Sequence, residues 1–136
     1  MMGFNGGPVF GPWLNGSGSN RPNDPYRTYG KFAHIIAPTP SLLWVFIDED
    51  ENSIDFGSFA VSMKTLTSMV DWPGTYHNYA ANLAFADGHG ESHKWRDHRT
   101  RNTTTKVSML VNPPMSQAPN NQDIIWLQQR TSALYQ

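Results

Sequence analysis

The chain has 136 residues, of which 38% are hydrophobic and 15% charged, with 11 Gly, 10 Pro and no Cys. This length suits one domain with one core, and the Gly and Pro content favours short strands and turns over long helices. The lack of Cys excludes disulfides, thiol catalysis and zinc fingers, and a net charge of −1 without a basic run argues against nucleic acid or an anionic membrane as a partner.

The first predicted segment, residues 1–29, is rich in Gly, Pro, Asn and Ser, and it is expected to be irregular. Residues 30–136 are expected to form the single globular core. Lys31 to Pro38 predicts a short helix or strand, which ends there because proline disfavours a helical conformation in the residue before it. No apolar run reaches the roughly 18 residues that a membrane-spanning helix needs, so we expect no membrane partner for this chain.

Two strands are predicted next. Leu42 to Ile47 is an unbroken apolar run closed by acidic residues, which predicts a strand buried on both faces. Ile54 to Met63 predicts a second strand antiparallel to the first, and the two are expected to form the centre of the sheet. Met63 to Trp72 is weakly patterned and predicts a loop or a helical turn.

The last part of the chain predicts a loop and then a helix. Arg96 to Gln122 is predicted as loop, interrupted by one short strand, Lys106 to Val111. Asn121 is a suitable N-cap for an amphipathic helix over residues 122–130. The apolar stripe of this helix consists of Ile124, Leu127 and Trp126. Together the elements predict an α+β domain, mainly antiparallel β, in which a short C-terminal helix covers a small sheet.

The strongest local signal is a hairpin in the stretch NLAFADGHGESHKW. Asp87-Gly88 suits a two-residue type I′ turn, whose central residues need a positive φ. Such a turn sets a register in which Asn82 faces His93. Alternation then places Leu83 and Phe85 on one face of the hairpin. The other face collects Asn82, Ala84, Ala86, His89, Glu91 and His93.

This polar face carries candidate metal ligands. His89, Glu91 and His93 can offer two imidazoles and one carboxylate to a cation, with an open position for water, as catalytic zinc sites do. Asp87 in the turn adds another carboxylate. The alternative interpretation is a solvated outer face whose polar residues only keep the hairpin soluble.

The acidic turn after the first strand is a second candidate site. Asp48, Asp50 and Asp55 supply the carboxylate oxygens that calcium prefers. The Gly and Glu of an EF-hand loop do not follow at their places, so an EF-hand is rejected. Here too the alternative is a solvated turn without an ion.

Catalytic motifs are poorly represented. The sequence has no Gly-x-Ser-x-Gly elbow and no phosphate-binding Gly-Lys-Ser/Thr loop. Any hydrolysis would have to be metal-assisted, with His77 or His89 as the proton carrier. Without a phosphate cradle, the substrate that suits such a site best is a small neutral ester or lactone.

A longer pattern carries a resemblance to a known family. His77, nine further residues and then Asp87-Gly88 resemble the H-x9-DG signature of bacterial proteins associated with prepilin-type processing, relatives of the major pseudopilin of type II secretion. The stretches TYGKFAHIIAPTPSLLWVFIDEDENSI, DWPGTYHN, LAFADGHGESHKWRD and DIIWLQQRT also look like segments of that family, in the same order. The resemblance covers most of the chain from about Tyr26 onward.

The resemblance implies a globular domain with an antiparallel sheet, which in the family follows a cleaved leader and a long apolar helix that anchors and polymerises. This sequence has no such helix and resembles only the C-terminal globular part. Major pseudopilins bind calcium, so calcium is the favoured ion and zinc the runner-up. Only His77, Asp87 and Gly88 map onto the signature.

The resemblance also bears on partners and location. In a full-length parent it implies pseudopilin or secretion-system subunits as partners, and a protein that is exported and anchored in the inner membrane. The chain as printed, which carries no export signal, is expected to remain in the cytoplasm.

Overall fold

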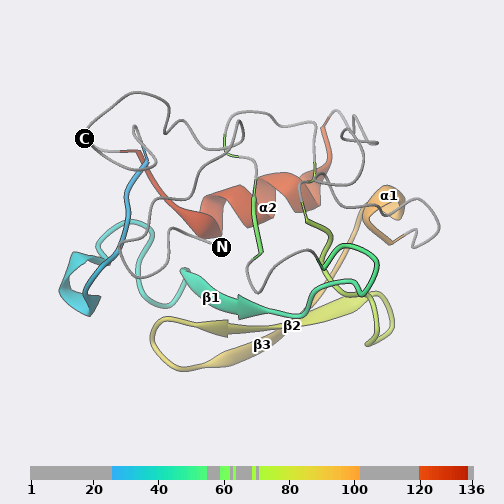
Figure 1. Cartoon of the computed structure of the whole chain (residues 1–136), viewed down its shortest axis with the longest axis horizontal. Helices are drawn as coiled ribbons and strands as arrows, with labels where there is room; N and C mark the ends of the chain where they lie inside the picture. Colours follow the sequence, from blue (N-terminus) through green and yellow to red (C-terminus); the bar gives the residue numbers. More distant parts are fainter. Residues whose placement is uncertain are drawn as a thin grey trace.

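The computed structural model describes residues 26–54, 59–61, 63, 69, 71–101 and 120–134. The described elements are, in chain order, η2 Phe32–His34, β1 Trp44–Ile47, β2 Ala80–Phe85, β3 Gly90–Lys94, α1 His98–Arg101 and α2 Gln122–Thr131. A small antiparallel sheet forms one layer and α2 crosses it as the other (Figure 1). The predicted α+β class, with a helix on a mainly antiparallel sheet, is confirmed.

The sheet has the order β1-β2-β3, so the first strand of the hairpin is central. Trp44 pairs with Phe85 and Ile47 with Leu83, with an irregularity between Trp44 and Phe46. Of the predicted second strand, Ile54 to Met63, residues 55–58 and 62 lie outside the described residues, and none of the described ones is in a strand. Among these, Ala60 bonds with Asp71 through its N–H and its carbonyl.

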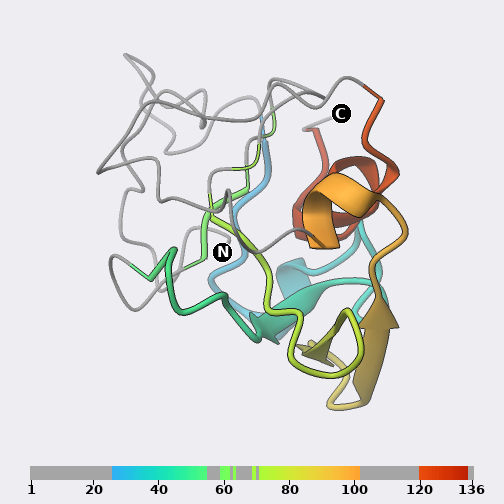
Figure 2. The same ribbon diagram turned by 90° about the vertical axis from the view of Figure 1, so that its right-hand side faces the viewer.

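The first strand is buried on one face only, and the prediction of two buried faces is wrong. Trp44 is buried on the side of α2, whereas Phe46 on the other side is 67% exposed. The reason is that α2 lies over a single face of the sheet (Figure 2). Six consecutive apolar residues thus include an exposed aromatic ring on the outer face.

The core lies between the sheet and α2. Ile124 and Leu127, both buried, pack from the helix against the strands, and the half-buried Trp126 joins them, as predicted. The side chain of Asn121 accepts hydrogen bonds from the N–H groups of the next turn, so the predicted N-cap is confirmed. The sheet side of the core is formed by Trp44, Ala81, Leu83, Phe85 and, just after β3, Trp95.

The first described residues lie beside the residues that follow α2. Tyr26 forms an antiparallel bridge with Leu134, and the N–H of Arg27 donates to the carbonyl of Ala133 at 2.8 Å. The hydroxyl of Ser132 donates back to the carbonyl of Arg27, also at 2.8 Å. This pairing holds the two distant ends of the described chain together.

Other predictions meet the structure only in part. The stretch Lys31 to Pro38 contains the short helix η2, and the predicted loop after residue 96 begins with the single helical turn α1. The predicted irregular segment, residues 1–29, falls largely outside the described residues, as does the predicted strand Lys106 to Val111. Among the described helices, none has the length and apolar character needed to cross a bilayer.

Candidate functional site

The hairpin turn is present, but its loop has three residues instead of two. The N–H of Phe85 donates to the carbonyl of His89 at 2.9 Å, and the N–H of Gly88 donates to the carbonyl of Phe85 at 3.0 Å. Within this loop only Gly88 has a positive φ, of 95°. This is a type I turn closed by a glycine bulge, so the predicted type I′ turn is wrong. The Asp87 carboxylate favours it by accepting the N–H of His89 at 3.1 Å.

The extra loop residue shifts the pairing by one position. Ala81 pairs with His93 and Leu83 with Glu91. Because directly opposed residues share a face, His89, Glu91 and His93 lie on the face of Leu83 and Phe85. The prediction had placed them on the opposite face with Asn82, Ala84 and Ala86. A slip of one residue moves every side chain of a strand to the other face.

His89 packs locally at the hairpin tip. Its ring stacks on Phe85, with centroids 4.3 Å apart and planes 3° from parallel. Its Nδ1 lies 2.5 Å from Oδ1 of Asp87. Hydrogen bonds from His89 lower the pKa of the Asp87 carboxyl. His89 and Asp87 therefore form a closed pair around the turn.

His93 is built into the junction between β3 and α2. Its ring lies 3.7 Å from the Trp126 ring at 17°, and meets the edge of Trp95 at 4.9 Å. Its Nδ1 is 3.4 Å from Oε1 of Glu91. Burial lowers the pKa of His93, and the hydrogen bond that its ring donates to Glu91 opposes this change. The His93 ring therefore packs against two aromatic side chains and also contacts a carboxylate.

His77 stands before β2 and the Asp87-Gly88 pair after it. The N–H and C=O of His77 bond with those of Ala80 at 3.3 and 3.2 Å. Between them Asn78 and Tyr79 have positive φ angles of 55° and 65°. This is the pattern of a type I′ turn, which thus occurs here instead of at Asp87-Gly88. Nε2 of His77 lies 3.6 Å from Oδ2 of Asp48.

The spacing between His77 and Asp87-Gly88 therefore corresponds to one strand and the turns at its two ends. The H-x9-DG residues do not share one site. They lie at opposite ends of β2, and each takes part in a different turn.

The acidic turn is held by its own hydrogen bonds. The Asp48 carboxylate accepts the N–H of Asn82 at 3.0 Å, which fastens it to β2. Asp50 is only 2% exposed, and its Oδ1 accepts both the N–H and the side-chain amide of Asn52 at 3.1 Å. Asp55 lies outside the described residues. In the part of the chain that the structure describes, no three His, Asp or Glu side chains are grouped so that they could hold a metal ion.

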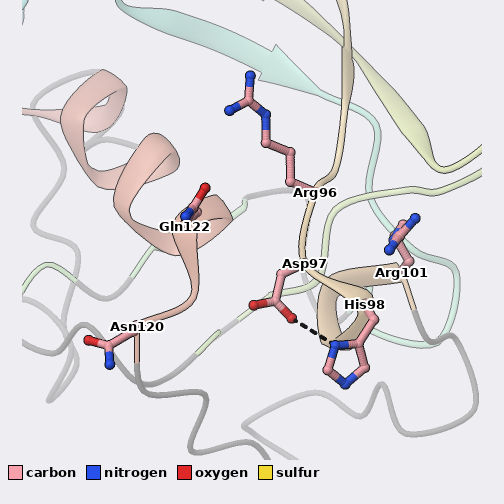
Figure 3. Close-up of a pocket in the computed structure, with 6 residues that line it drawn as sticks. All are labelled: Arg96, Asp97, His98, Arg101, Asn120 and Gln122. Atoms are coloured by element: carbon pink, nitrogen blue, oxygen red, sulfur yellow. Dashed lines mark ion pairs between the residues drawn. The ribbon is translucent and has the colours of Figure 1, made fainter.

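A polar cleft that the sequence interpretation missed lies between α1 and the start of α2 (Figure 3). Its volume is about 350 Å³. Asn120 and Gln122 come from the start of α2, whereas Asp97 and His98 come from the start of α1. The arginines of this cleft lie on either side of the segment that joins β3 to α1. The lining residues are Arg96, Asp97, His98, Arg101, Asn120 and Gln122.

Several polar groups around this cleft have partners of their own. Asp97 is held by Arg99 through Nε at 2.8 Å and Nη2 at 2.6 Å, which lowers the pKa of Asp97 and raises that of Arg99. The buried Asp123 accepts the N–H groups of Arg96 and Asp97 at 3.1 and 2.9 Å. The guanidinium of Arg101 lies over the Tyr79 ring, 5.5 Å from its centroid. The sequence does carry a signal for this cleft, in the close spacing of Arg96, His98 and Arg101.

Comparison with models of protein families gives no match, and neither do comparisons with curated proteins and with solved structures.

Proposed function

We propose that this chain is a structural module, the globular part of a pseudopilin-like H-x9-DG protein, which serves assembly with pseudopilin or secretion-system subunits. The observation that carries the proposal is the placement of the signature residues. His77 and Asp87-Gly88 each take part in a turn, at opposite ends of the central strand β2. Residues that shape a strand in this way are needed for the fold, and they need no substrate.

The surroundings of the histidines support the same proposal. His89 is paired with Asp87 and stacked on Phe85, and His93 is stacked on Trp126. Each imidazole thus already has a packing role, and the rings are not gathered around one open space. A catalytic site needs its groups within reach of one reacting atom.

The proposal is tested by measuring the stability of the chain and its association with other subunits. His77→Ala, which removes the contact of Nε2 with the Asp48 carboxylate, should lower the free energy of unfolding and speed amide exchange in β2, with His34→Ala in the exposed helix η2 as the control. Pull-down with the soluble domains of secretion pseudopilins should retain the original protein and lose the destabilised variant. An unchanged stability in His77→Ala, or no retention of the original protein, would contradict the proposal.

A divalent cation is part of the proposal, with calcium favoured over zinc. The acidic turn supports it better than the hairpin does, since Asp48 and Asp50 follow β1 on one short turn that is rich in oxygen atoms. Asp55 is the third carboxylate that the sequence offers there. Carboxylate and amide oxygens suit calcium, whereas imidazoles would favour zinc.

Thermal unfolding after chelation, repeated with calcium, magnesium or zinc, tests the ion. An ion that binds only the folded chain stabilises it by about 2.7 kcal/mol at a hundredfold excess over Kd. Calcium should raise the Tm most, and Asp48→Asn or Asp55→Asn should abolish the rise, while Glu51→Gln in the same turn should retain it. If zinc raises the Tm and His89→Ala abolishes this rise, the ion site lies at the hairpin. If none of the three ions raises the Tm, the proposal of a bound divalent cation is wrong.

One observation favours a second function, a metal-dependent hydrolase of a small neutral ester or lactone. The close contact between His89 Nδ1 and the Asp87 carboxylate orients the ring as in a general base. Hydrolysis of an activated ester should then stop with chelator, and fall at least ~100-fold in His89→Ala. Activity that survives chelation and this change would rule the hairpin out as its source.

A further inference from the structure

Strand β3 is an edge strand with an open backbone. It pairs with β2 on one side, and no described strand pairs with its other side. Four of its five residues are exposed, with only His93 half-buried. In both overall views no described element lies beyond it (Figures 1 and 2). An exposed strand edge is a template for pairing with another strand.

The hydrogen bonds show which backbone groups of this edge are free to pair. The N–H of Phe85 bonds to His89, and the N–H of Trp95 bonds to Tyr79, so odd-numbered residues of this strand face β2. Asn82 confirms the alternation, because its carbonyl accepts from the N–H of Asp48 on the β1 side. The N–H and C=O groups of the even-numbered residues of β3 must point outward. These residues are Gly90, Ser92 and Lys94.

We propose that two copies of this chain pair through antiparallel β3 edges, on a two-fold axis that passes beside Ser92. In that register Ser92 bonds to Ser92 of the second copy, and Gly90 bonds to Lys94 of the second copy. Because the outward groups alternate in the same way in both copies, every one of them finds a partner. The result is one continuous sheet with three strands from each copy.

The side chains of β3 favour a second copy over an unrelated strand. The register places Glu91 directly opposite His93 of the second copy, and the two-fold axis repeats this contact. Side chains that hydrogen-bond at such positions stabilise strand pairs, and the Glu91 carboxylate can accept a hydrogen bond from the His93 imidazole. Charges often protect edge strands, but the ammonium of Lys94 faces Gly90 of the second copy, which has no side chain to repel or clash. The small Ser92 side chains meet at the axis.

The proposal makes the backbone N–H of Ser92 necessary for association but not for the fold of one copy. Ser92→Pro removes this donor, and proline is tolerated on a strand edge where the N–H faces outward. Ser92→Thr keeps the donor and serves as the matched control. Since the Ser92 pair contributes two hydrogen bonds, Ser92→Pro should weaken association at least about tenfold. Glu91→Lys should weaken it as well, because it removes the carboxylate that accepts from His93 of the second copy.

Sedimentation of the full chain over a range of concentrations measures the association. The expected result is a dimer that Ser92→Thr retains and that Ser92→Pro and Glu91→Lys lose. A chain that stays monomeric at high concentration, or a dimer unchanged in Ser92→Pro, would overturn the proposal. If Ser92→Pro fails to fold, amide exchange of the original chain decides. The N–H groups of Gly90, Ser92 and Lys94 should exchange more slowly as concentration rises, and no change there would overturn it.

Discussion

The imidazole of His93 lies flat against the indole of Trp126, with ring centroids 3.7 Å apart. The guanidinium carbon of Arg130 lies over the same indole, 4.2 Å from its centroid. Trp126 belongs to α2 and His93 to β3, so these ring contacts attach the edge strand to the helix. Stacking of this kind adds to the free energy gained from burial alone.

Replacing this indole should loosen the junction. Trp126→Ala is expected to lower the free energy of unfolding by about 2 kcal/mol, less than for a fully buried tryptophan because the ring is half-buried. Trp126→Phe keeps a flat ring for His93 and should lose less than half of that. Urea denaturation followed by circular dichroism measures both. Equal losses in the two variants would mean that the ring contact contributes little.

The same junction predicts a dependence of stability on pH. Burial lowers the pKa of His93 from its ordinary value of 6.5. As pH falls, the unfolded chain therefore takes up the proton first, which favours unfolding. The contribution of His93 should be complete above pH 6.5, decrease as pH falls from there towards the lowered pKa, and then level off.

Urea denaturation at a series of pH values tests this, with His93→Gln as the variant that cannot titrate. The decrease below pH 6.5 should disappear in His93→Gln. Asp87 and Asp97 do not confuse the result, because hydrogen bonds from His89 and Arg99 lower their pKa values below 3.8. If stability still decreases below this pH in His93→Gln, another titrating group causes the decrease.

Asp123 is expected to be among the most sensitive polar residues. Its buried carboxylate accepts the N–H groups of Arg96 and Asp97, and so it ties the end of β3 to the first turn of α2. Asp123→Ala leaves these donors buried without that acceptor, and should lower the free energy of unfolding by about 3 kcal/mol. Asp123→Asn keeps one oxygen and should recover part of the loss. A loss below about 1 kcal/mol in Asp123→Ala would show that water replaces the carboxylate.

Two glycines provide a matched test of the hairpin turn. A Cβ atom at Gly88 or at Gly30 would meet no atom within 4 Å, but only Gly88 has a positive φ, of 95°. Gly88→Ala should therefore destabilise the chain by about 1 kcal/mol or more through backbone strain, while Gly30→Ala should not. Thermal unfolding of the two variants distinguishes them. Equal effects would contradict a bulge at Gly88.

The sequence predicted those elements whose signals are local. The helix α2 was found because Asn121 caps it and because Ile124 and Leu127 recur at helical spacing. The hairpin was found because Asp87-Gly88 favours a turn between two strand-like runs. In each case one short stretch contains both the signal and the structure.

Features that depend on pairing were missed. Asp87-Gly88 fits a two-residue loop and also a three-residue loop with a glycine bulge, and the two registers differ by one residue. That single residue moved His89, Glu91 and His93 to the core side of the sheet. Likewise, nothing local shows that the strand beside β1 is β2, which lies far along the chain. For this reason the predicted polar face of the hairpin was wrong.

The pairing of Tyr26 with Leu134 places the first and last described residues side by side. A short peptide linker could join these neighbouring residues, and the chain could then be opened at an exposed turn such as the one that contains Gly88. The fold thus suits circular permutation, because the order of its elements could change while their contacts stay the same.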